Sequence, residues 1–539
     1  MFTEDASEVH TLKKRRWLVL ACLTLGLSLI VLDETVVNTA IPILTADLDL
    51  TAYEAEWIDS AYALTFASLL IFFGQLADRY GRKRFFLIGL TVFVLASLGV
   101  VLSDASTGVI MARAIQGCGG AIILPTSLAI INTYYHGRDR VVAFAIWGGA
   151  IGSVAALGPL VGAWLMTFHS WHWAFTINVP VGLSVFVASW FCIPGSRSKV
   201  KEKELDVTGA FLITFALFAV VFAIIEGGRF GFLYQRQPFT AGSMTWPTSL
   251  PPITLLFLMM GIASFLAFLF VERSRLKQDK DVTLNFILFK SRSFTAGNIV
   301  AFVVSLGEFG LLFTLPLFLE LVGGYDLMQA GVILFAIALG ALIATLTGSF
   351  LCQLLGAKRT LQLGLVFEIM GIAGLGITLT GTSTGWEIAP WLVAYGVGIG
   401  YATGQLASLI LSGVPHNDSG VAGAFQSTSR QLGAALGVAV LGTTLVIGLG
   451  SAAGTLEDEG VPADRAQEIA RELQDSGGES IPDLATEPGG VDFAQVAIGT
   501  FTNASKSVAW VVVFTLSTGL LVSFWIPKNA AQEQQSGQN

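Results

Sequence analysis

The chain has 539 residues, of which 53% are hydrophobic and 13% are charged, against roughly 25% charged residues in an ordinary soluble domain. Its mean hydropathy is +0.70, and one buried core cannot hold that much apolar surface, so a soluble globular protein is excluded. Apolar stretches of about 20 residues recur along the chain, each long enough to cross a bilayer as a helix. The sequence therefore predicts an all-α integral membrane protein.

The N-terminus is expected in the cytoplasm. Lys13, Lys14, Arg15 and Arg16 precede an apolar stretch that is too long for a signal peptide and has no small-residue cleavage site after it. The four cysteines lie far apart in or beside apolar segments, a pattern that indicates neither a disulfide nor a metal site.

We predict fourteen spans, and the distribution of basic residues supports that number. Segments assigned to the inside hold 24 of the 30 Lys and Arg, with Arg430 counted among them, whereas outside segments hold 5 and Arg113 falls within a span. Adding or removing one span would reverse every later loop and destroy this asymmetry. The predicted spans are residues 17–43, 55–75, 84–103, 107–131, 141–166, 174–193, 206–226, 251–271, 294–320, 326–352, 359–380, 388–412, 430–450 and 507–526.

A weak internal repeat divides the chain into two halves. Residues 74–84 follow the second span and residues 349–359 follow the tenth; the second copy has Gln353 where the first has Asp78. Two six-helix bundles with two inserted helices explain this spacing. The predicted order is a cytoplasmic N-terminus (1–16), an N-terminal bundle (17–193), a linker (194–205), the inserted helices (206–271), a cytoplasmic interfacial segment (272–293), a C-terminal bundle (294–526) with an external loop (451–505), and a cytoplasmic tail (527–539).

Two extramembrane segments are expected to be helical. The stretch Ala463 to Ser476 is amphipathic with a helical period. Residues 281–294 mix apolar and basic residues, which suits a short helix lying at the membrane surface.

Asp33 and Glu34 lie inside the first span, where a charged group costs at least a few kcal/mol and is rarely kept without a task. Asp33 lies about 14 Å below the outer end of its span, and Arg113 lies about 9 Å below the same surface. At these depths the two side chains can pair across helices. We predict that Asp33 carries a proton with Arg113 as its relay; a static structural ion pair is the alternative.

Further polar groups in the spans are candidates for substrate binding. Glu34 points about 100° away from Asp33 around the helix, and Glu308 lies near mid-membrane beside two phenylalanines, where charge and ring contacts suit a lipophilic cation. A contact between helices, without substrate, is the alternative for both acids. The candidate substrate residues are Glu34, Asn38, Glu308, Phe309 and Phe313.

The remaining acids are weaker candidates. Glu368 lies in the eleventh span, whereas Asp59, Glu226 and Glu320 lie near span ends, where we expect contact with water. No phosphate-binding GxxxxGK[ST] loop is present, which leaves ATP-driven transport without support.

The loop from Gly74 to Arg84, GQLADRYGRKR, joins the second and third spans on the inside. It combines a glycine for close helix approach, an acid that can cap the next helix, and a basic end that suits the negative inner membrane face. This combination resembles the signature loop of the major facilitator superfamily. The positions that match are Gly74, Asp78, Arg79, Gly81 and Arg82.

Four further segments resemble the drug:proton antiporter branch of that family. They are LDETVVNTAIP from Leu32, MARAIQGCGG from Met111, GSVAALGPLVG from Gly152, and WHWAFTINVPVG from Trp171. In the C-terminal half, SRQLGAALGVAV from Ser429 is the main similar element. The chain departs from the pattern at Ala163, where a second glycine is usual, and at Glu34, where the family more often has a small or polar residue. The chain resembles an EmrB/QacA-type exporter with fourteen spans.

This resemblance implies a major facilitator fold that works by alternating access in the cytoplasmic membrane, with both termini in the cytoplasm. It implies a proton-coupled multidrug efflux antiporter that exports lipophilic, cationic compounds. Its partners would be protons, a small lipophilic substrate and the lipid bilayer, with the proton gradient as energy source, no cofactor, metal or nucleic acid, and a monomeric state. Gly152, Gly158, Pro159 and Gly162 form a small-residue face on the fifth span, which allows close packing and a kink; this suits a gate between the halves, with plain helix packing as the alternative.

Two alternatives remain open. The same fold exports a cell's own lipids or secondary metabolites, and this sequence does not separate the two kinds of cargo. An integral membrane enzyme acting on lipids would need clustered polar catalytic groups near one interface, and the sequence shows no such cluster.

Overall fold

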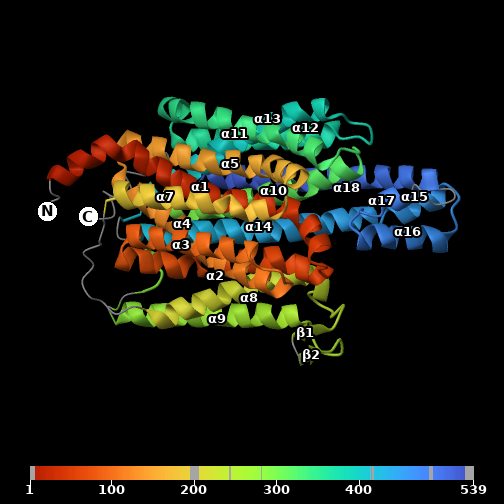
Figure 1. Ribbon diagram of the computed structural model, residues 1–539, viewed down its shortest axis with the longest axis horizontal. Helices are drawn as coiled ribbons and strands as arrows, with labels where there is room; N and C mark the ends of the chain where they lie inside the picture. Colours follow the sequence, from red (N-terminus) through yellow and green to blue (C-terminus); the bar gives the residue numbers. More distant parts are fainter. Residues whose placement is uncertain are drawn as a thin grey trace.

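The computed structural model describes residues 6–194, 206–241, 244–278, 280, 282–412, 414–415, 418–484 and 490–527. Within these ranges nearly all regular structure is helical, and the long helices run side by side along one axis (Figure 1). One short antiparallel strand pair is the exception. The expected all-α architecture is confirmed.

The N-terminal bundle contains six spans. The first five are single helices, and the sixth is divided at Ile177 into a short and a long helix. Within the bundle, α2 and α3 pack on α4, and α1 packs on α5. The helices are α1 (Ala6–Asp47), α2 (Ala52–Tyr80), α3 (Arg82–Val101), α4 (Ser106–Tyr134), α5 (Gly137–Phe168), α6 (His172–Thr176) and α7 (Asn178–Cys192).

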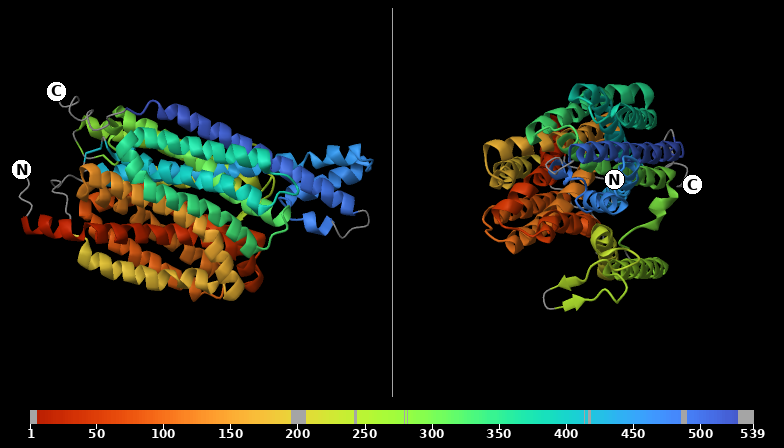
Figure 2. Two further views of the ribbon diagram at one scale, coloured as in Figure 1. Left: turned by 90° about the horizontal axis from the view of Figure 1, so that it is seen from above. Right: turned by 90° about the vertical axis from the view of Figure 1, so that its right-hand side faces the viewer.

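The two inserted helices, α8 (Val207–Phe230) and α9 (Ile253–Lys277), pack on each other at one side of the molecule (Figure 2). The strands β1 (Phe239–Ala241) and β2 (Met244–Trp246) lie in the connection between them. Helix α8 contacts α2 through aromatic rings, with the centroids of Trp57 and Phe222 6.3 Å apart.

This contact corrects one expectation. Glu226, expected in water at a span end, is fully buried near the C-terminal end of α8, and neither carboxylate oxygen has a hydrogen-bond partner among the described residues. The reason is that α8 lies against α2 there, a tertiary contact that hydropathy does not reveal.

The C-terminal bundle contains the remaining six spans. Its helices are α10 (Arg292–Leu321), α11 (Leu327–Leu355), α12 (Ala357–Thr378), α13 (Gly385–Ser412), α14 (Ser419–Leu449) and α18 (Gly490–Ser523). Before α10, the predicted interfacial helix is a single 3-10 helix, η1 (Phe286–Lys290). Helix α10 packs on α14, and α12 packs on α13.

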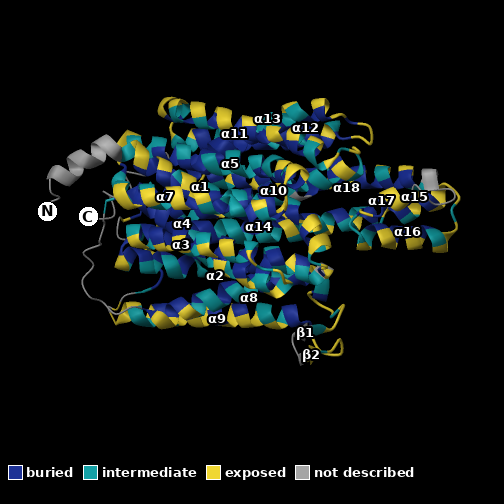
Figure 3. Ribbon diagram, viewed as in Figure 1, coloured by how far each residue is buried: buried dark blue, intermediate teal, exposed yellow. Residues whose placement is uncertain are grey.

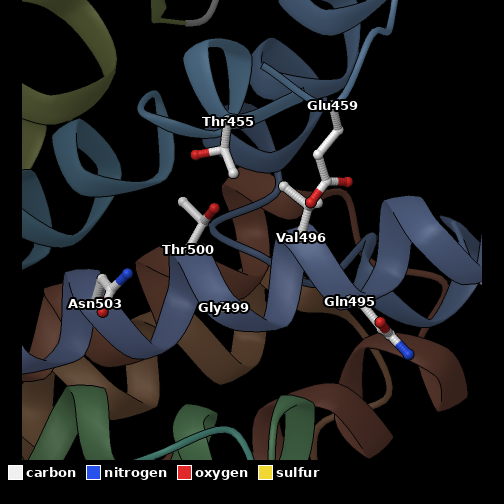
Figure 4. Close-up of a pocket in the computed structure, with 7 residues that line it drawn as sticks. All are labelled: Thr455, Glu459, Gln495, Val496, Gly499, Thr500 and Asn503. Atoms are coloured by element: carbon white, nitrogen blue, oxygen red, sulfur yellow. The ribbon is translucent and has the colours of Figure 1, made fainter. Parts of the chain in front are cut away.

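Between α14 and α18, three short helices extend beyond the bundle (Figure 1): α15 (Ala452–Asp458), α16 (Ala463–Asp475) and α17 (Ile481–Leu484). The helix expected at 463–476 is α16, which buries Ile469 and Leu473. A hollow of about 420 Å³ lies between this segment and α18, lined by Thr455, Glu459, Gln495, Val496, Gly499, Thr500 and Asn503 (Figure 4).

Thirteen of the described helices are long and apolar enough to cross a membrane, with α6 and α7 counted together. Helix α13, with 28 residues, packs along α11 and α12 and makes a fourteenth long helix. Large apolar side chains such as Leu95, Phe270, Leu346 and Phe514 are exposed, and exposed residues follow the outer faces of the helices (Figure 3). These faces suit contact with lipid.

The first and last spans have ends at the same side of the bundle. The hydroxyl of Tyr135, directly after α4, donates to the carbonyl of Arg16 in α1. Lys358, in the first turn of α12, donates to the carbonyl of Phe524, directly after α18, at 2.8 Å. The side chain of Arg138, in the first turn of α5, donates to Gln353, in the last turn of α11. This bond connects the end of the N-terminal bundle near Tyr135 with the end of the C-terminal bundle near Lys358.

Candidate functional site

Asp33 is the centre of a buried polar network in the N-terminal bundle. Its carboxylate accepts hydrogen bonds from Arg113 at 2.6 Å, Gln116 at 2.7 Å and Asn178 at 2.7 Å. Ser97 accepts from the same two amides, at 2.9 Å from Gln116 and 3.3 Å from Asn178. Four helices, α1, α3, α4 and α7, therefore meet at one carboxylate, which is fully satisfied in its ionised form.

Arg113 is held from several sides. Besides Asp33, its guanidinium donates to the carbonyl of Ile58 at 3.0 Å and lies 3.5 Å from a carboxylate oxygen of Asp59. Its Cζ lies 4.3 Å from the ring centroid of Tyr62, in the range of a cation–π contact. The pairing of Asp33 with Arg113 expected from their depths is present.

Exposure distinguishes the two carboxylates that share Arg113. The side chains of Asp33 and Arg113 are completely buried, whereas that of Asp59 is 38% exposed. Asp59 is therefore the more accessible of the two carboxylates that contact Arg113, and Asp33 is reached only through the network or after a rearrangement of the helices. Asp59, expected only to reach water, thus also contacts the buried pair.

Glu34 and Asn38 are one helical turn apart on α1 and lie on the same face. Glu34 is partly buried and Asn38 is exposed, and no hydrogen bond or ion pair joins Glu34 to any described residue. Arg430 of the C-terminal bundle and Asp59 both lie within electrostatic range of Glu34. This face of α1 is therefore directed toward the region between the bundles.

Glu308 lies on α10 and contacts Arg430 of α14 at 3.3 Å, with its side chain 5% exposed. Phe309, beside it, is partly buried, and the side chain of Phe313 lies outside the described part of the structure. A substrate cation at Glu308 would have to compete with Arg430 for the carboxylate.

The position of Arg430 corrects the sequence-based assignment to the cytoplasmic side. Helix α14 begins at Ser419, eleven residues before the predicted start of the span, so Arg430 lies within the bundle. Residues 419–429 are mostly small and polar, and their low hydropathy conceals the first three turns of the helix.

The signature loop joins the two bundles at the end where α2 finishes. Asp78 accepts hydrogen bonds from the backbone amides of Gly420 at 2.8 Å and Val421 at 3.1 Å, in the first turn of α14. Beside it, Asn132 of α4 donates to Ser419 at 2.7 Å. The carboxylate thus satisfies free amides at a helix N-terminus and lies at the positive end of its dipole.

The capping role expected for Asp78 was assigned to the wrong helix. The helix that follows the loop, α3, has Gly81 at its N-cap and no side-chain cap. Asp78 instead serves α14, because Arg82 fixes its orientation: the Nε of Arg82 donates to Asp78 at 2.8 Å, and its guanidinium also contacts Thr133 of α4.

The other loop positions have local structural roles. Gly81 has φ of +114°, which side chains rarely adopt. A Cβ on Gly74 would lie 2.8 Å from the carbonyl oxygen of Gly420, so the glycine allows α2 to approach α14. Arg79 is partly buried, with its Cζ 5.7 Å from the ring centroid of Tyr80.

The small residues of α5 contact both bundles. A Cβ on Gly152 would lie 2.8 Å from Ile399 of α13, and Gly331 of α11 lies close to the carbonyl of Pro159. Gly158 and Gly162 instead lie against Thr35 and Thr39 of α1. Both packing within the bundle and contact between the bundles therefore involve this face.

Three polar partners of the network were not singled out from the sequence. Gln116 and Asn178 lie within two segments that resemble the family, so the sequence held a signal for them. Ser97 lies in an otherwise apolar stretch of α3 and had none.

A family model described as the Major Facilitator Superfamily matches residues 23–438. The chain belongs to this superfamily. It is therefore a multi-pass membrane transporter and not an enzyme.

The chain resembles two curated proteins over most of its length. It is 26% identical to a tetracenomycin C resistance and export protein of Streptomyces glaucescens, with 83% of this chain and 80% of that one covered. It is 30% identical to a methylenomycin A resistance protein of Streptomyces coelicolor, with 79% and 85% covered. Among solved structures, the human organic anion transporter MFSD10 (TETRAN) has a TM-score of 0.56 at 14% identity, with 93% and 99% covered, which supports the fold alone.

The buried network predicts a strong interaction between Asp33 and Arg113. Replacing Arg113 by Gln should destabilise the protein by about 3–5 kcal/mol, because it leaves a buried carboxylate without its cation. The double variant Asp33→Asn/Arg113→Gln should lose less than the sum of the two single changes. Unfolding of the purified protein in mixed detergent micelles measures both, with Arg471→Gln on the exposed face of α16 as control. Additive losses would contradict the pairing.

The contact of Asp78 with α14 predicts a specific change in accessibility. In a background without the four native cysteines, Asn132→Cys should react slowly with a membrane-impermeant maleimide, because Asn132 is 2% exposed. Adding Asp78→Ala should speed the reaction at least about fivefold, since the amides of α14 lose their acceptor. Asp139→Asn is the matched control, because Asp139 pairs with Arg16 of the same bundle. Equal rates in the two variants would refute this role.

Proposed function

We propose that this protein is a proton-coupled exporter of lipophilic, cationic compounds, and that it acts by alternating access as a drug efflux transporter. The buried Asp33–Arg113 pair beside the partly exposed Asp59 carries the proposal for protons. Export of drugs is supported by the resistance and export functions in the names of its relatives.

In the proposed cycle, Asp33 carries the coupling proton. The arrangement described here favours its ionised form, because three donors satisfy the carboxylate. Protonation removes the charge that holds Arg113, Gln116 and Asn178 in place, so α1, α4 and α7 are released from one another. An equilibrium between two arrangements of the bundles then depends on whether the proton is bound.

The proposed substrate face is that of Glu34 and Asn38 on α1. Glu34 is partly buried and has no direct partner among the described residues, so its carboxylate is free to pair with a cationic substrate. Asp33 and Arg113 both lie within electrostatic range of Glu34. A cationic substrate bound at Glu34 and a proton bound at Asp33 would therefore each oppose binding of the other. Substrate and proton therefore favour opposite arrangements, which is the requirement for antiport.

The remaining expectations belong to the same proposal. Both termini lie in the cytoplasm, which the excess of basic residues in the loops on that side supports. The proton gradient supplies the energy, no cofactor takes part, and the protein works as a monomer with fourteen spans, like the EmrB/QacA-type exporters. Export of a cell's own metabolite is the second candidate, because the name of one relative includes the export of tetracenomycin C.

Transport by purified protein tests proton coupling. In proteoliposomes, an imposed pH gradient should drive ethidium against its concentration gradient, and Asp33→Asn should lower this flux at least about tenfold. Exchange of ethidium at equal concentrations on both sides should persist in the variant, because it needs no net proton movement. Wild-type protein that moves ethidium at the same rate with and without the gradient would overturn proton coupling.

Substrate charge tests the role of Glu34. Glu34→Gln should raise the KM for ethidium about tenfold, equivalent to about 1.4 kcal/mol of lost attraction, and change the KM for the uncharged dye Nile red less than twofold. Glu320→Gln, an exposed acid on α10, is the control. Equal effects on both dyes would contradict recognition of the cation by Glu34.

A further inference from the structure

The C-terminal bundle contains a second cluster of buried polar groups, which the proposed function leaves without a role. Glu308 of α10 and Glu368 of α12 are 4% and 0% exposed, and Tyr395 of α13 is fully buried. Arg430 of α14 contacts Glu308 directly. Glu368 lies within electrostatic range of Glu308 and Arg430, and Tyr395 lies within range of both acids. Four helices thus contribute to one cluster.

Close packing of α12 on α13 fixes the position of Glu368. A Cβ on Gly398 would lie 2.5 Å from the Cγ of Glu368, and a Cβ on Gly371 would lie 2.7 Å from the backbone nitrogen of Tyr395. Glu368 and Gly371 share one face of α12, and Tyr395 and Gly398 share one face of α13, because each pair is three residues apart. The two glycines let these faces meet, so Glu368 is enclosed against the face that carries Tyr395.

Several atoms of this cluster have no hydrogen-bond partner in the described part of the chain. They are both carboxyl oxygens of Glu368, one carboxyl oxygen of Glu308, and the hydroxyl of Tyr395. Buried polar atoms are normally satisfied. This cluster therefore has vacant donor and acceptor positions, whereas the carboxylate of Asp33 has three partners.

The charges of the cluster do not balance. Among the described residues of the packed helices, α11 carries no Asp, Glu, Lys, Arg or His, while α14 carries only Arg430. The other charged residues of α10, α12 and α13 lie toward helix ends: Arg292, Glu320, Lys358, Arg359 and Glu387; in α18, Asp492 lies in the first turn and Lys506 lies midway along the helix. Glu34 of the N-terminal bundle also lies within range of Arg430. Two buried acids therefore share one arginine.

We propose that Glu308, Glu368 and Arg430 form a second proton-binding site, which holds one exchangeable proton between the two carboxyls. An ionised carboxylate without a cation is too costly in this environment, so the acid that Arg430 does not pair remains protonated. In the arrangement described here, Glu308 pairs with Arg430 and Glu368 carries the proton. This inference rests on the proposed proton coupling and adds a second site to it.

Exchange follows from a change of partner. When Glu368 loses its proton, the O–H bond breaks, the electron pair stays on the carboxylate, and a water molecule accepts the proton. Arg430 then compensates Glu368, and Glu308 takes up a proton in its place. Arg430, whose side chain is 16% exposed, is more accessible than either buried acid.

Infrared spectroscopy of the full-length protein in lipid tests the shared proton without any need for transport. The band of protonated buried carboxyls at neutral pH should lose one group's intensity in Glu368→Gln. It should lose the same in Glu308→Gln, because Glu368 then pairs with Arg430. Arg430→Gln should instead add one protonated carboxyl. Glu320→Gln, on the same helix as Glu308, should leave the band unchanged. An unchanged band in Glu368→Gln would overturn the site.

A second measurement tests whether this proton is exchanged in transport. In proteoliposomes, the pH gradient that just balances an ethidium gradient gives the number of protons moved per ethidium. Glu368→Gln should move one proton fewer than wild type and Glu320→Gln the same number. Equal numbers in wild type and Glu368→Gln would overturn the exchange. Absence of gradient-driven transport in wild type would refute the proposed function, while the infrared result still decides whether the proton is bound.

Discussion

The packing of the membrane-spanning helices depends on the free-energy cost of burying a charged side chain at the depth of the lipid hydrocarbon. An ion in a medium of low dielectric needs an opposite charge and a full set of hydrogen bonds, or it must lose its charge. Asp33 meets the first condition through Arg113, Gln116 and Asn178. Since these partners come from α4 and α7, one carboxylate fixes how the helices of the N-terminal bundle pack around α1. The same bonds make that packing sensitive to a single proton.

The two bundles solve this problem differently. Each carries an acid on its first helix that contacts an arginine, Asp33 with Arg113 and Glu308 with Arg430. In the N-terminal bundle the second acid, Asp59, is partly exposed and lies 3.5 Å from the same arginine. In the C-terminal bundle the second acid, Glu368, is fully buried and has no hydrogen-bond partner among the described residues. Three donors stabilise the charge of Asp33, whereas the lack of donors at Glu368 is the basis for the proton that we propose there.

Local sequence information predicted the spans, the helix at 463–476 and the contact of Asp33 with Arg113, because hydropathy, period and depth depend only on position along the chain. It did not predict that Asp78 caps α14, since that helix begins more than 300 residues later. It placed Arg430 outside the membrane, because small polar residues hide the start of α14. Glu226 was expected in water for a similar reason: only the packing of α8 on α2 buries it.

Two helices connect both acid–arginine pairs to the contact between the bundles. Helix α4 carries Arg113 and, about 28 Å further along its axis, Asn132, which donates to Ser419. Helix α14 begins at that serine, where Asp78 holds its first turn, and carries Arg430 about 16 Å along its axis. Each of these helices carries one of the two arginines and ends at this contact, so a change in the partner of either arginine acts on a helix that reaches it. The proton binding that we propose in each bundle thus acts on helices that end where the bundles are joined.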